Sequence, residues 1–150
     1  MVKIFLGTDH AGYALKEKIK QWLDEWGYDH EDMGAFSYDK DDDYPDFIRL
    51  AAEKVAEDPK NSRGIVIGGS GQGEAIVANR HKGVRATVYA ARKLDLELVK
   101  LMREHNDSNV LSLGSRFVPE EEAKQVVKTW LETPFPGEER HKRRIAKIDA

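Results

Sequence analysis

The sequence contains no cysteine among its 150 residues. A disulfide framework, a thiolate metal site and a thiol nucleophile are therefore excluded. No apolar run reaches the roughly 20 residues that a membrane-spanning helix needs. The opening residues, MVKIFLGTDH, turn polar too early for a signal peptide. We therefore expect a cytoplasmic protein that contacts no membrane.

An excess of positive charge is also missing. The formal net charge is −3, which argues against a general nucleic-acid binder. Two local charge runs remain, the acidic DKDDDYPD at residues 39–46 and the basic RHKRRIAK at residues 140–147. Runs of this kind are most often solvated faces, and their residue types alone indicate nothing more.

Apolar runs rich in β-branched residues alternate with longer amphipathic stretches. The pattern predicts strands at residues 2–8, 28–34, 64–69, 84–89 and 109–115. It predicts helices at residues 13–26, 45–58, 74–80, 91–105 and 119–131, and a polar helix after residue 139. Strands that alternate with helices indicate βαβ units. We expect an α/β fold, a Rossmann-like αβα sandwich with a five-stranded parallel sheet, in a single domain spanning residues 1–150.

Ligands of such sheets bind beyond the carboxyl ends of the strands. Three segments follow predicted strands there: GTDHAG, GGSGQGE and GSRF. The loop that enters the fifth strand, REHNDSN, belongs at the opposite edge of the sheet unless its helix ends inside the cleft. The pattern leaves that point open.

The segment VIGGSGQGEAIVANR, residues 66–80, places four glycines before Glu74. Between a strand and a helix, its N–H groups can bind an anion, although the spacing matches neither G-x-G-x-x-G nor the Walker A loop. An acid at a helix start is explained by the helix dipole alone. Beside converging amides, the same carboxylate could take a proton from carbon while the amides hold the oxyanion.

Asp9 and His10 end the first predicted strand. Asp9 suits a helix N-cap, and the pair also suits proton transfer or phosphate contact. His105 is a second candidate acid–base group, although a histidine near a helix end is more often structural. Asn106 could serve simply as the helix stop.

Three arginines are candidate anion contacts. Arg116 follows the fifth strand, and Arg140 and Arg144 share one helix face. Guanidinium groups suit bidentate contact with a phosphate. No histidine pair has zinc-ligand spacing such as H-x-x-x-H, so a metal site is disfavoured.

Taken together, the segments GTDHAG, DYPDF, GGSGQGEAIVANR, GVRA, REHNDSNVLSLGSR and RHKRRIAKI resemble the family of ribose-5-phosphate isomerase B and the galactose-6-phosphate isomerase subunits. The similarity runs in order along nearly the whole chain. It implies an aldose–ketose isomerase without metal or cofactor, on a Rossmann-like fold. It also implies a homodimer with shared active sites, which in some members pairs into a tetramer.

The resemblance also implies roles for individual residues. Asp9 and His105 would help to open the sugar ring, and Ser70 would assist proton movement at the oxygens. The tail, residues 137–150, would dock on the partner subunit and bring Arg140 and Arg144 to its site. The implied substrate and phosphate contacts are His10, Tyr44, Gly69, Gly71, Gln72, Gly73, Asn106, Arg116, Arg140 and Arg144.

One departure from the family pattern bears on the base. Many members carry a cysteine base where this chain has Gly68, whereas a second branch has GGSGxGE with the glutamate as base. The chain matches the second branch, so the resemblance implies that Glu74 abstracts the proton.

The implied reaction interconverts ribose 5-phosphate and ribulose 5-phosphate through an enediolate. Alternatives are a six-carbon substrate such as allose or galactose 6-phosphate, a tetrose phosphate, or a non-catalytic module that binds sugar phosphates. The acidic stretch before Tyr44 could alter the sugar end of the site. A dinucleotide-binding domain fits less well, because the loop spacing is wrong and no acid ends the second strand at a ribose-reading position.

Overall fold

A five-stranded sheet forms the centre of the structure, a computed structural model that describes residues 1–150. The strands are β1 (Lys3–Thr8), β2 (His30–Asp32), β3 (Ser62–Gly68), β4 (Ala86–Tyr89) and β5 (Val110–Gly114). Their order is β2-β1-β3-β5-β4, and every neighbouring pair is parallel. The predicted α/β fold with a five-stranded parallel sheet is confirmed.

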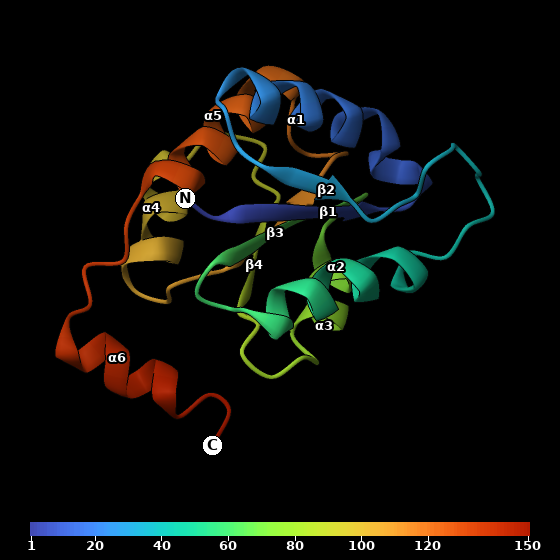
Figure 1. Ribbon diagram of the computed structural model, residues 1–150. Coiled ribbons are helices and arrows are strands. Elements are labelled where there is room, and N and C mark those ends of the chain that lie inside the picture. The colour runs from blue at the N-terminus through green and yellow to red at the C-terminus, as the bar shows by residue number, and fades with distance from the viewer.

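Helices cover both faces of this sheet (Figure 1). One face carries α1 (Tyr13–Glu25), α4 (Leu96–Glu104) and α5 (Glu120–Glu132), and the other carries α2 (Pro45–Glu57) and α3 (Gln72–Ala78). Central strands are apolar on both sides for this reason: Leu6 joins the core beneath α1 and α5, whereas Phe5 packs toward α2. None of the helices combines the length and apolarity needed to cross a bilayer.

Helix α4 begins later than the periodicity predicted. The expected start at Ala91 is wrong, because residues 91–95 form a loop. The Asp95 carboxylate accepts a hydrogen bond from the Leu98 N–H at 3.1 Å, and the Asp95 N–H donates to the Tyr89 hydroxyl at 2.9 Å. This cap fixes the helix start at Leu96, and His105 caps the other end.

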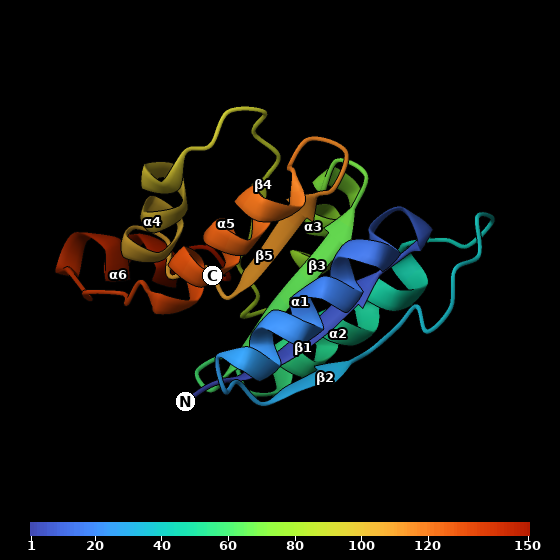
Figure 2. The same cartoon turned by 90° about the horizontal axis from the view of Figure 1, so that it is seen from above.

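The last helix, α6 (Glu139–Ala146), lies outside the two layers and beside α4 (Figures 1 and 2). His141 is its only buried residue. The ring of His141 stacks on the ring of His105 with centroids 4.4 Å apart. Beyond the helix, the Asp149 carboxylate accepts a hydrogen bond from the Gly83 N–H at 2.8 Å. The tail therefore contacts its own chain through a few polar residues.

The strand order creates a crevice between β1 and β3. The chain leaves β1 toward β2 on one side, and it leaves β3 toward β4 on the other side. Where the winding direction reverses, the loops beyond the strand ends separate and leave room for a ligand.

Candidate active site

A cavity of about 400 Å³ lies at this crevice. Its walls come from the segments that follow β1, β3 and β5 and from the residue that precedes α2. The lining residues are Asp9, His10, Ala11, Tyr44, Gly69, Ser70, Gly73, Glu74, Arg116 and Phe117. Eight of these ten were singled out from the sequence; Ala11 and Phe117 were not.

Glu74 lies in the first turn of α3 and is 5% exposed. Burial raises the pKa of its carboxyl above the ordinary value of 4.5, hydrogen bonds from backbone N–H groups oppose this shift, and the negative charge of Asp9 adds to it. A carboxylate with a raised pKa is a stronger base. The site thus holds a buried carboxylate with a raised pKa beside the cavity.

The raised pKa predicts the pH dependence of any reaction in which Glu74 acts as the base. Only the ionised carboxylate accepts a proton, so kcat/KM should fall as pH drops through an apparent pKa above 4.5. Replacing Asp9 by asparagine removes a negative neighbour and should lower the pKa of Glu74. Carbon NMR of the glutamate carboxyls measures the shift in both proteins. An unchanged Glu74 titration in Asp9→Asn would contradict the electrostatic coupling.

Gly68 provides the space that the Glu74 carboxylate occupies. A Cβ atom built at position 68 would overlap the carboxyl carbon and both oxygens of Glu74. A side chain at Gly68 and the present position of Glu74 are therefore incompatible.

Gly68→Ala should displace the Glu74 carboxylate, the predicted base. We expect kcat to fall about 100-fold, as for a catalytic group misplaced by about 1 Å, and overpacking to cost about 1–3 kcal/mol of stability. Gly27→Ala is the control: its Cβ would meet nothing within 4 Å, but its φ of +77° strains any side chain. That variant should lose stability and keep its kcat. Wild-type kcat in Gly68→Ala would contradict the assignment.

The other glycines of the loop leave space for neighbouring side chains of the site. Gly71 has a φ of +78°, which begins α3 in a left-handed conformation, and its carbonyl accepts a hydrogen bond from Ser112 at 2.6 Å. A Cβ at Gly73 would approach the Tyr44 ring to 2.7 Å, and one at Gly69 would approach the Arg116 guanidinium to 3.1 Å. The loop thus lets Tyr44 and Arg116 lie against its backbone.

Asp9 fits both roles that the sequence suggested, a helix N-cap and a carboxylate of the site. Its Oδ1 accepts a hydrogen bond from the Ala11 N–H at 3.0 Å, which caps the short 3-10 helix His10–Gly12. The same side chain lines the cavity. A structural cap and a site carboxylate are here one residue.

Four predicted site residues lie elsewhere in this subunit. His105 caps the carboxyl end of α4, and Asn106 follows it on the way into β5. They stand at the amino edge of the sheet, opposite the cavity, which settles the question that the sequence left open. Arg140 and Arg144 lie on α6 beside His105, and Arg140 pairs with Glu138 at 2.9 Å. Gly71, the N-cap of α3, and Gln72, its first residue, do not line the cavity.

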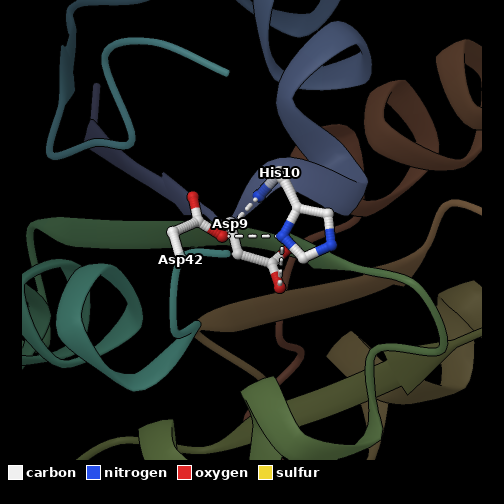
Figure 3. Close-up of side chains that lie close together, drawn as sticks. All are labelled: Asp9, His10 and Asp42. Carbon is white, nitrogen blue, oxygen red and sulfur yellow. Dashed lines mark hydrogen bonds and ion pairs between the residues drawn. The ribbon is translucent and has the colours of Figure 1, made fainter. Parts of the chain in front are cut away.

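Asp42 is a site residue that sequence reasoning missed. Figure 3 shows it beside Asp9 and His10. Its Oδ1 accepts a hydrogen bond from the His10 backbone N–H at 3.0 Å and lies 2.7 Å from the ring Nδ1. The interpretation of residues 39–46 as a solvated face is wrong for Asp42, although Asp41 and Asp43 are exposed.

Three residues have potential metal-ligand atoms that all lie within 4.8 Å of one another: Asp9, His10 and Asp42. The shortest of these approaches is the hydrogen bond between Asp42 and the His10 ring. We therefore assign a hydrogen-bonded pair here rather than a metal site. Metal independence stays a prediction.

Comparison with known proteins places this geometry in a family. The model of the family described as Ribose/Galactose Isomerase matches residues 4–148. The ribose-5-phosphate isomerase B of Mycolicibacterium paratuberculosis is 43% identical over 96% of this chain and 87% of its own length. A putative sugar phosphate isomerase of Bacillus subtilis is 39% identical over 98% of this chain and 95% of its own length.

Solved structures agree with these relatives. Ribose-5-phosphate isomerase B from Mycoplasma genitalium, with bound ribulose 5-phosphate, superposes with a TM-score of 0.92 at 39% identity over 98% of this chain and 93% of its own. The Clostridium thermocellum enzyme gives a TM-score of 0.89 at 41% identity over 99% and 95%. The sequence, the fold and the position of the cavity all lead to one assignment: this chain belongs to the ribose/galactose isomerase family.

Proposed function

We propose that the protein interconverts ribose 5-phosphate and ribulose 5-phosphate through an enediolate, without metal or cofactor. The observation that carries the proposal is the buried Glu74 carboxylate, which lies beside the glycine loop in the cavity at the crevice. Relatives named ribose-5-phosphate isomerase B support the choice of substrate. Such an activity belongs to the pentose phosphate pathway, in the cytoplasm.

The proposal assigns a group of this chain to each step that follows ring opening. With the sugar ring open, Glu74 takes the proton from C2 of the aldose and returns it to C1, which yields the ketose. The negative charge that develops on the sugar oxygens is stabilised by backbone N–H groups of the loop from Gly69 to Gly73. The hydroxyl of Ser70, on the cavity wall, moves protons between the oxygens. Substrate and product differ only in the positions of hydrogens, so no co-reactant is needed.

Phosphate binding falls to His10 and Arg116. Both line the cavity, and a guanidinium forms two parallel hydrogen bonds to phosphate oxygens. Tyr44 and the loop from Gly69 to Gly73 border the sugar.

The remaining groups come from a second subunit in this proposal. His105 and Asn106 stand at the opposite edge of the sheet from Glu74, so one subunit alone does not join the ring-opening pair of His105 and Asp9. In a homodimer with shared sites, the partner presents these residues together with the arginines of its tail. Ile76, 59% exposed on the helix that carries Glu74, offers apolar surface for such an interface. Pairing of dimers into tetramers is a further prediction.

The first test is the substrate. Purified protein should convert ribose 5-phosphate faster than allose 6-phosphate or galactose 6-phosphate, with EDTA present throughout. The cavity is open to solvent and does not by itself exclude a longer sugar. Preference for either hexose phosphate would move the assignment to that substrate. Binding of all three without turnover would favour a non-catalytic module.

A further inference from the structure

Asp42 is the member of the acidic run that turns into the protein. Its side chain is 8% exposed, whereas Asp39, Asp41 and Asp43 are exposed. Its Oδ2 is buried and has no hydrogen-bond partner. A buried carboxylate is costly unless a positive charge or several donors face it. The buried Asp42 carboxylate therefore needs a compensating positive charge or hydrogen-bond donor nearby.

The compensating group is His10. The Asp42 Oδ1 is held by the His10 backbone N–H at 3.0 Å and by the ring Nδ1 at 2.7 Å (Figure 3). Because an ionised carboxylate only accepts hydrogen bonds, the ring Nδ1 carries the proton of this contact. Two contacts to one residue fix both the backbone and the ring rotation of His10. The second ring nitrogen, Nε2, is left free of Asp42.

The charges around His10 favour its protonated form. The hydrogen bond to Asp42 raises the pKa of His10, and the negative charges of Asp9, at 3.9 Å, and of Asp42 raise it further. Loss of solvation around the ring and the positive charge of Arg116 oppose the shift. Tyr38 is another neighbour with a titratable group, and its ring meets the imidazole edge to face with centroids 6.1 Å apart. Tyr44 and Glu74 line the same cavity as His10. These groups come from the segments after β1 and β5, from the loop before α2 and from the first turn of α3.

The protonation state decides what Nε2 offers to a phosphate. In the neutral ring, Asp42 keeps the proton on Nδ1, and Nε2 is a hydrogen-bond acceptor that repels phosphate oxygens. In the cationic ring, Nε2 donates a hydrogen bond and adds a positive charge. Resting on the proposed function, we propose that Asp42 is a positioning residue that holds His10 in its cationic, phosphate-donating form.

The proposal predicts a pH-dependent affinity. For Asp42→Asn, which keeps the shape and the oxygen but removes the charge, KM for ribose 5-phosphate at pH 7.5 should rise about tenfold, the effect of one charged hydrogen bond. The pH at which KM begins to rise should also shift downward, and kcat should stay within about twofold. Asp41→Asn is the matched control, because it removes the same charge from an exposed neighbour with no side-chain hydrogen bond.

A second readout does not depend on turnover. Imidazole NMR titration reports the pKa of each of the five histidines, and the His10→Gln spectrum assigns the His10 signal. Asp42→Asn should lower the pKa of His10 and weaken the binding of inorganic phosphate about tenfold, and Asp41→Asn should change neither. An unchanged His10 titration and unchanged phosphate binding in a folded Asp42→Asn protein would overturn the proposal. If instead the wild type fails to isomerise ribose 5-phosphate, the proposed function fails, and the phosphate titration still decides the role of Asp42.

Discussion

Replacing Glu74 by glutamine should lower kcat by about 10³-fold or more, within the range measured for catalytic acids and bases. Glutamine has the size and shape of glutamate but cannot take a proton from carbon. The space beside Gly68 that holds the carboxylate holds the amide equally well. Affinity for the sugar phosphate should therefore change little, and the loss should appear in kcat rather than in KM.

A matched control separates chemistry from helix stability. Glu121 also stands in the first turn of a helix, but it is exposed on α5 and does not line the cavity. Glu121→Gln and Glu74→Gln each remove an acid from a helix N-terminus, a change of a few tenths to about 1 kcal/mol. Only Glu74→Gln should lose turnover. Steady-state kinetics and thermal unfolding of both variants make the comparison, and wild-type kcat in Glu74→Gln would show that another group is the base.

Deleting residues 137–150 should raise KM for ribose 5-phosphate by about 100-fold or more. The tail carries Arg140 and Arg144, and the loss of each charged hydrogen bond to phosphate costs about 1.5–3 kcal/mol. The core should stay folded, because His141 is the only buried residue of α6. Circular dichroism and thermal unfolding report the fold, and initial rates report KM. Unchanged kinetics would show that the basic tail is only a solvated face.

A pair of double variants tests the arginines without removing the tail. Arg140→Ala with Arg144→Ala should reproduce most of the rise in KM. Lys142→Ala with Arg143→Ala removes the same charge from the same helix, at positions outside the predicted phosphate contacts, and should change KM far less. Equal effects of the two pairs would indicate a general electrostatic attraction instead of specific contacts.

Mixed dimers test whether the active sites are shared. A subunit with Glu74→Gln keeps its tail, and a subunit with both arginines replaced keeps its base. In a two-fold dimer of one of each, one site has both intact halves, so random mixing should restore about a quarter of the wild-type sites. Rates are compared at a substrate concentration well below the KM of the arginine variant, and no gain in rate after subunit exchange would place the arginines in the site of their own subunit.

The sequence was sufficient for the sheet and for most of its coverage. Strands buried on both faces leave continuous apolar runs such as KIFLGT and GIVIG, and the helices between them are amphipathic. The start of α4 escaped prediction because Leu94 continues the apolar spacing while the Asp95 cap breaks the helix. The hydrogen bond of the Asp95 cap therefore sets the helix start, and the apolar periodicity does not.

The site was predictable where topology alone places residues. Segments that follow parallel strands meet at one edge, so Asp9, Glu74 and Arg116 were expected together, and they line one cavity. Asp42 lies in a loop without periodicity, where exposed and buried aspartates look alike in sequence. His141 resembles the charged residues around it, and only the stacking on His105 distinguishes it. Contacts between distant loops carry no local pattern.

Conversion of ribose 5-phosphate in D₂O with EDTA present, followed by NMR, tests the central claim that a protein base moves a proton between C1 and C2. The account predicts that wild-type protein forms ribulose 5-phosphate with deuterium at C1, because the base exchanges its proton with solvent. Folded protein that gives no conversion, or conversion in which the migrating hydrogen is wholly retained, as in a hydride shift, would contradict it.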